Sequence, residues 1–222
     1  MKLFRASQVY KLIGSPKAKG ELLTETAKGT IREIAKQDIF GFSAFLGNKY
    51  TEKGILLEDM AIEHSGLIRD RFYTKHIGRL SNDYITGECD VLDKDNNLII
   101  DTKCSWDIGT HPFFKDEAIE KVKKAGYDIQ MQCYMWLYDV GYADIDFWLF
   151  PCPRDLLTRF DDDYQLIDLV EQTDIKDRIT TVTIARDERV IECIKEVIPH
   201  AQAYYDVLCE QCIKTAYFNF YR

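Results

Sequence analysis

The chain has 222 residues, of which 46% are hydrophobic, 13% aromatic and 30% charged. This composition is typical of a globular protein with a substantial core, and it excludes disordered, collagen-like and disulfide-scaffold classes. No apolar run approaches the roughly 20 residues that cross a bilayer, and the polar N-terminus does not resemble a signal peptide. We therefore expect a cytoplasmic protein with no membrane partner, folded as a single domain over residues 1–222.

The formal net charge of −8 is unevenly distributed along the chain. Residues 1–53 hold ten Lys or Arg and five Asp or Glu, a balance of +5, whereas the remaining residues hold 19 and 32, a balance of −13. A basic first quarter on an acidic body favours local binding of an anion. The same distribution also fits a solubility pattern with no ligand.

The hydrophobic periodicity predicts helices, then a β-meander, then further helices around a strand. Ser7 is expected to N-cap a short first helix that ends near Gly14. The other predicted helices span 25–37, 50–63, 115–124, 128–140 and 187–212. The predicted strands span 72–80, 84–92, 98–104, 145–150 and 180–184. This order predicts the α/β class, with a central mixed β-sheet flanked by helices.

The seven cysteines are irregularly spaced and lie mostly within apolar runs, as is typical of buried, reduced thiols. Cys209 and Cys212 form a CxxC pair, but a structural zinc site needs four ligands. No second CxxC and no HxxxH accompanies the pair. We therefore expect neither a zinc site nor a redox centre there.

The predicted hairpin of residues 84–104 brings three charged side chains together. Asp101 and Lys103 project from the same face of their strand, because side chains alternate with a period of two. A turn near Asn96 places Asp90 opposite Asp101 across the ladder. Three apolar residues precede Asp101, so its strand is expected to be buried, where an unpaired carboxylate is costly. A bound divalent cation would remove that cost, and a cross-strand Asp–Lys salt bridge at the end of the sheet is the alternative.

Two helices carry further candidates. In the helix of residues 50–63, Glu58 lies beside Ile55 and Ala61 and is expected to face inward, as a metal ligand or in a salt bridge. In the helix of residues 128–140, Gln130 and Tyr134 are an i,i+4 pair whose amide and phenol groups can hydrogen-bond phosphate oxygens. Ordinary packing of an aromatic-rich helix explains the second pair equally well.

In chain order these residues read Gly-x-x-x-Glu, Asp-x10-Asp-x-Lys and Gln-x-x-x-Tyr. The pattern resembles the PD-(D/E)xK nuclease superfamily, and more specifically its lambda-exonuclease, YqaJ-type viral recombinase family. The segments 6–9, 130–136 and 186–189 also resemble motifs of that family. Cys89 replaces the Pro of the superfamily's name, and Asp101 stands where the family pattern has Glu. The resemblance implies a restriction-endonuclease-like α/β core.

The resemblance also implies a site that hydrolyses phosphodiesters with Mg²⁺, or with Mn²⁺ in its place. Asp90, Asp101 and the Thr102 carbonyl would bind the metal, and Glu58 would bind it directly or through water. Lys103 would orient or deprotonate the attacking water.

Further residues would contact the DNA. By the same resemblance, Gln130 and Tyr134 would hold the phosphate or the nucleophile. Arg5, Ser7 and Lys17 would contact a terminal 5′-phosphate. We expect no Fe–S cluster, because the family members that have one carry a Cys ahead of the Gly-x-x-x-Glu helix, and the first Cys here is Cys89.

The function implied is an ATP-independent 5′→3′ exonuclease that resects double-stranded DNA ends for phage-type recombination. Implied partners are a single-strand annealing protein and two further copies of the chain in a homotrimeric ring, in the host cytoplasm if the gene is phage-encoded. Three alternatives stay open at this point. They are a structure-specific PD-(D/E)xK endonuclease, a non-catalytic DNA-binding protein on a nuclease core, and an acidic α/β protein whose carboxylates are salt-bridged.

Overall fold

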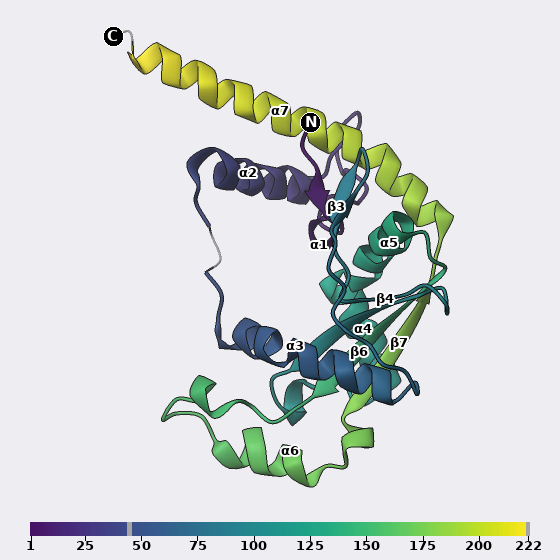
Figure 1. The fold of residues 1–222 in the computed structure, drawn as a ribbon. Coiled ribbons are helices and arrows are strands. Elements are labelled where there is room, and N and C mark those ends of the chain that lie inside the picture. Colours follow the sequence, from purple (N-terminus) through teal and green to yellow (C-terminus); the bar gives the residue numbers. More distant parts are fainter. Residues whose placement is uncertain (44–45, 221–222) are drawn as a thin grey trace.

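The computed structural model describes residues 1–43 and 46–220, which form two sheets and the helices around them (Figure 1). One sheet has the strand order β1-β3-β2 and the other the order β4-β5-β6-β7. The strands are β1 (Phe4–Arg5), β2 (Leu80–Ser81), β3 (Ile85–Gly87), β4 (Val91–Asp93), β5 (Leu98–Ser105), β6 (Tyr142–Leu149) and β7 (Ile179–Ala185). The helices are α1 (Ala6–Val9), α2 (Glu25–Phe40), α3 (Lys49–Leu67), α4 (Lys115–Ala125), α5 (Tyr127–Tyr138), α6 (Leu169–Gln172) and α7 (Glu188–Phe220).

The four-stranded sheet is mixed, because β5 and β6 run parallel while the other neighbouring pairs run antiparallel. Helix α3 covers one face, where Ala61 packs with Trp148. Helices α4 and α5 cover the other face, where Ala118 and Met131 share a core with Phe147. The predicted α/β fold, with a mixed sheet flanked by helices, is therefore confirmed. No described helix contains a stretch that is long and apolar enough to span a membrane.

The predicted helices are present, and most are longer than expected. Helix α2 begins after Thr24, whose hydroxyl accepts the Ala27 N–H at 3.0 Å, and α3 begins after Asn48, whose side chain accepts the Thr51 N–H at 3.0 Å. The expectation for Ser7 is wrong. Helix α1 begins at Ala6, so Ser7 lies inside its first turn and is exposed.

Two of the predicted strands are wrong. The segment 72–80 has the composition of a strand, but only Leu80 and Ser81 pair with a neighbour, and Phe72 and Ile77 are almost 90% exposed (88% and 89%). The predicted strand 84–92 is divided into β3 and β4, which belong to different sheets. At the break, the Asp90 carbonyl accepts the His76 N–H at 2.7 Å instead of a ladder hydrogen bond.

Arg69 fastens the end of α3 to β6. Its guanidinium donates to Asp146 at 2.7 and 2.9 Å and to Asp144 at 2.9 Å. The hydroxyls of Thr181 and Thr183, on β7, each donate to one of these carboxylates at 2.6 Å. Because the Asp146 side chain is completely buried, its charge depends on these partners. The network therefore fixes the helix that carries Glu58 against the sheet.

We expect Arg69→Met to lower the free energy of unfolding by about 3–5 kcal/mol, because it leaves two buried carboxylates without a counter-charge. Denaturant unfolding measures this value. Arg154→Met is the control, because Arg154 and its partner Asp163 are both mostly exposed, and a change within about 0.5 kcal/mol is expected there. Equal effects of the two substitutions would contradict a role for the Arg69 network in stability.

Candidate active site

A hollow of about 430 Å³ lies along one edge of β5. Four consecutive β5 residues, Thr102 to Ser105, line it together with Glu58, Asp90 and Tyr127. Successive strand residues point to opposite faces, so a lining of consecutive residues means that the hollow follows the strand edge. The edge is open there because β4 pairs with β5 only as far as Ile100.

Asp90 and Asp101 meet as the hairpin pattern predicted. Val91 pairs with Ile100, and one further step in the same register places Asp90 opposite Asp101. The Asp90 carboxylate accepts the Thr102 N–H at 2.8 Å and the Thr102 hydroxyl at 3.2 Å. The edge of β5 therefore fixes the orientation of Asp90.

Asp101 is buried inside the sheet, with 2% of its surface exposed. Lys103 contacts its Oδ2 atom as an ion pair, and among the described residues this atom receives no hydrogen bond. Burial raises the pKa of Asp101 despite the opposing charge of Lys103, and Asp90 raises it further. The Asp101 carboxylate is therefore buried against the Lys103 ammonium, and a metal ion would have to displace that ammonium to reach its Oδ2 atom.

Lys103 stays charged in this environment. Burial would lower its pKa, but the carboxylates of Asp101 and Asp90 outweigh burial and raise it. Its Nζ atom also donates to the Thr102 carbonyl at 3.3 Å and lies 5.1 Å from the centre of the Tyr127 ring. The ammonium therefore adds a fixed positive charge to the wall of the hollow.

Glu58 reaches the hollow from α3. Its carboxylate accepts a hydrogen bond from Lys75, in the segment between α3 and β2. The expected apolar surroundings are correct for Ala61, which is fully buried, but wrong for Ile55, which is 68% exposed and lines the hollow. The helix turns Glu58 to the boundary between its buried and exposed faces, so the carboxylate stays accessible.

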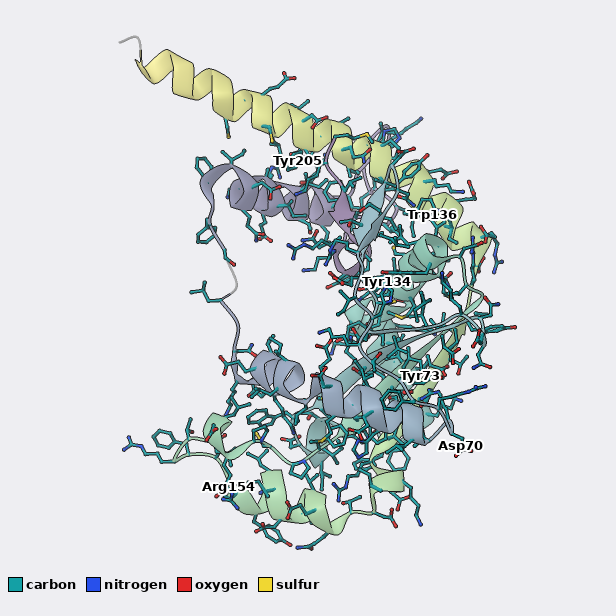
Figure 2. All side chains as sticks on the ribbon, viewed as in Figure 1. Asp70, Tyr73, Tyr134, Trp136, Arg154 and Tyr205 are labelled. Atoms are coloured by element: carbon teal, nitrogen blue, oxygen red, sulfur yellow. The ribbon has the colours of Figure 1, made fainter. Side chains whose placement is uncertain are left out.

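Gln130 and Tyr134 form the expected pair on α5, and Gln130 Nε2 donates to the Tyr134 hydroxyl at 3.0 Å. Both side chains are buried, and neither lines the hollow. Tyr134, labelled in Figure 2, packs closely against Gly87. Burial raises the pKa of Tyr134, and the charge of Asp101 raises it further. Their predicted contact with phosphate stays a prediction.

The three N-terminal candidates lie elsewhere. Arg5, Ser7 and Lys17 are exposed, and none lines the hollow beside β5. Lys17 lines a larger hollow of about 640 Å³ between Tyr10 and Thr26. We place the candidate site in the smaller hollow, because Glu58, Asp90 and Lys103 line it and Asp101 lies against Lys103.

The donor atoms of the site suit a hard cation. Carboxylates, a backbone carbonyl and a buried oxygen without a hydrogen bond are the ligands that Mg²⁺ and Mn²⁺ prefer. Across residues 1–43 and 46–220, however, no three His, Cys, Asp or Glu side chains are arranged to hold a metal ion. Asp101 and Glu58 are each paired with a lysine instead. The residues fit a metal by chemistry, and binding one requires these carboxylates to exchange their lysine partners.

Lys53 was not a candidate from the sequence. Its side chain is completely buried, and its ammonium donates to the carbonyls of Trp106 and Phe150 at 2.7 Å each. Lys53 precedes the buried Leu57 and Ala61 at intervals of four residues. That spacing indicates that Lys53 shares the buried face of α3, but a lysine is normally expected on the exposed face of a helix.

His111 was also missed. It is 4% exposed, its Nδ1 atom lies 3.2 Å from the hydroxyl of Ser105, and its Nε2 atom has no partner among the described residues. Burial lowers the pKa of His111 to about 4, with a smaller contribution from Lys121. The ring is therefore neutral near the wall of the hollow. His111 directly follows a short 3₁₀ helix, Ile108–Thr110, and the sequence there has no pattern that indicates a site.

Comparison with known proteins decides the family. The chain is 54% identical to a phage-related exonuclease from Haemophilus somnus 129PT, whose crystal structure superposes with a TM-score of 0.92. The match covers 95% of this chain and 96% of that one. This chain belongs to the phage-related exonuclease family. The resemblance to the lambda-exonuclease, YqaJ-type family is thereby confirmed.

Two further similarities are more distant or cover less of the chain. An alkaline exonuclease from Laribacter hongkongensis has a TM-score of 0.64 over 96% of this chain at 17% identity, which shows the shared fold alone. A curated 33 kDa chaperonin from Mannheimia succiniciproducens is 38% identical over 117 residues, 51% of this chain. The match spans only 36% of that chaperonin's length. Comparison with protein-family models gives no match.

Gly87 allows Tyr134 of this exonuclease-family chain to pack on the backbone of β3. A Cβ atom at residue 87 would lie 2.7 Å from the Tyr134 ring. We expect Gly87→Ala to lower the free energy of unfolding by about 1–3 kcal/mol through overpacking. Gly29→Ala is the control, because its Cβ meets nothing within 4 Å and the helix should gain roughly 0.5–1 kcal/mol. Destabilisation by both substitutions in denaturant melts would contradict the assigned contact.

His111 should make stability sensitive to acid. Its folded-state pKa of about 4 lies below the ordinary value of 6.5, so the unfolded chain binds more protons between these values. The contribution to stability is complete above pH 6.5 and falls by up to about 3 kcal/mol as the pH drops towards 4. Unfolding free energies at several pH values, for the wild type and for His111→Gln, measure this effect. Identical pH slopes of the two proteins would show that His111 does not titrate as assigned.

Proposed function

We propose that this chain is a metal-dependent, ATP-independent exonuclease that resects linear double-stranded DNA in the 5′→3′ direction. The observation that carries the proposal is that Asp90 and Lys103 line one open hollow and that the buried Asp101 lies directly against Lys103. It supports hydrolysis of a phosphodiester because the hollow combines metal-type oxygen donors with a fixed cation. The 54% identity to a phage-related exonuclease supports DNA as the substrate.

The residues divide the chemistry between them. Asp90, Asp101, the Thr102 carbonyl and Glu58 would hold Mg²⁺ or Mn²⁺. The bound metal would supply an acidified water molecule and a positive charge beside the scissile phosphate. Lys103, which the carboxylates of Asp101 and Asp90 keep protonated, would orient that water, and its charge would offset the charge that develops on the phosphate.

The remaining candidates position the DNA. Gln130, held by Tyr134, keeps the reacting groups aligned from the buried side of the site. Arg5, Ser7 and Lys17 give the basic first quarter of the chain contact with the 5′-phosphate end.

The wider setting that we propose is phage-type recombination in the cytoplasm of a bacterial host. An exonuclease that removes one strand exposes the other for a single-strand annealing protein, which is the expected partner. A homotrimeric ring around the duplex would keep the enzyme on its substrate despite a net charge of −8, because enclosure needs little nonspecific attraction.

A time course on linear duplex DNA tests the activity. The duplex carries one labelled, 5′-phosphorylated end, with Mg²⁺ in one reaction and EDTA in another, beside a covalently closed circular duplex. Metal-dependent release of mononucleotides from the 5′ strand, with the circle intact, is the expected result. Cutting of the circle would indicate an endonuclease instead, and a gel shift without cleavage would indicate a non-catalytic DNA-binding protein.

Asp101→Asn should reduce cleavage in this assay at least about a hundredfold, because an amide is a poorer metal ligand and lacks the charge that the cation requires. Circular dichroism should show that the variant remains folded, since Asn preserves the shape of the side chain. Asp206→Asn, at an exposed position on α7, is the matched control and should cleave like the wild type. Cleavage by Asp101→Asn at the wild-type rate would refute the site assignment.

A further inference from the structure

A lysine outside the nuclease motif lies at the candidate metal site. Lys75, in the segment between α3 and β2, donates to the Glu58 carboxylate. Asp90 and Asp59 act on the same ammonium electrostatically, in addition to Glu58. One side chain from a connecting segment therefore neutralises the acidic side of the hollow.

The backbone around Lys75 is fastened to the site. The next residue, His76, donates its N–H to the Asp90 carbonyl at 2.7 Å. Two residues further on, Gly78 donates its N–H to Glu88 at 3.0 Å, and its carbonyl accepts the Tyr138 hydroxyl at 2.7 Å. The segment is therefore anchored directly to Asp90, whereas the Lys75 side chain is about half exposed (48%). A fixed backbone with an exposed side chain lets the ammonium move while its tether stays in place.

Stability does not account for this ion pair. Exposed pairs of this kind contribute little to folding, because water screens the charges and two long side chains lose freedom. Deeper in the site, Lys103 forms the equivalent ion pair with the buried Asp101. The two lysines thus occupy two of the carboxylates that the proposed metal site needs.

We propose that Lys75 is the counter-ion of Glu58 in the proposed metal site and a positioning residue for the reaction. Its ammonium holds Glu58 until a divalent cation competes for that carboxylate. Once displaced, the ammonium stays at the rim of the hollow, tethered through His76 to Asp90, and its charge becomes available to a DNA phosphate. Metal binding and DNA binding are then coupled through Glu58. This inference rests on the proposed function, because it takes Glu58 as part of the metal site.

Calorimetric titration with Mn²⁺ alone tests the competition without relying on activity. Lys75→Met removes the ammonium and keeps the length of the side chain, so we expect Mn²⁺ to bind about three- to tenfold more tightly than to the wild type. Lys195→Met is the matched control, because Lys195 pairs with Glu192 on the exposed face of α7. It should bind Mn²⁺ like the wild type. Thermal unfolding in EDTA should show that both variants are folded.

A double-mutant cycle identifies the carboxylate involved. In a Glu58→Gln background, Lys75→Met should no longer tighten Mn²⁺ binding, because the lysine and the metal no longer share a ligand. Equal or weaker Mn²⁺ binding by Lys75→Met in the wild-type background would overturn the counter-ion role. That failure differs from failure of the proposed function, in which the wild type would show no Mn²⁺ binding that Asp101→Asn removes.

Discussion

Asp101 lies inside a β-sheet, and a carboxylate in that environment needs a cation. The protein supplies one from two residues further along the same strand, because the alternation of β5 places Lys103 on the same face. The pair brings both charges to the open edge of β5, where the N–H of the intervening Thr102 holds Asp90. Strand β5 thus holds the two acids and the lysine of the nuclease motif next to one another, with Asp90 and Lys103 lining the hollow.

The same sheet carries a second set of buried charges on its opposite face. Asp101 is paired in register with Ile145, whereas Thr102 is paired with Asp146. Asp146 faces α3, where it accepts two hydrogen bonds from Arg69, and it does not line the hollow. Alternation therefore separates carboxylates that stabilise the sheet from the carboxylate that belongs to the site. The first set has a complete complement of partners, and Asp101 does not.

The sequence allows two interpretations of the acidic residues, a metal site or a set of salt bridges. The structure contains the salt bridges at Asp101 and Glu58, and the family relationship favours the nuclease. These findings are compatible, because a lysine that pairs with a carboxylate balances its negative charge, and a metal ion can take the place of that lysine. The two lysines differ in exposure, because Lys103 is mostly buried and Lys75 is about half exposed to solvent.

The sequence by itself determined the helices, the hairpin register that opposes Asp90 and Asp101, and the family. Each follows from local periods or from the order of short motifs, which are properties of neighbouring residues. Only the tertiary structure decided the break between β3 and β4, the burial of Lys53 and the pairing of Lys75 with Glu58. These features depend on contacts between segments far apart in the chain. Each of these groups is stabilised by a partner that it contacts only in the folded protein. The periodicity of the neighbouring residues does not specify that partner.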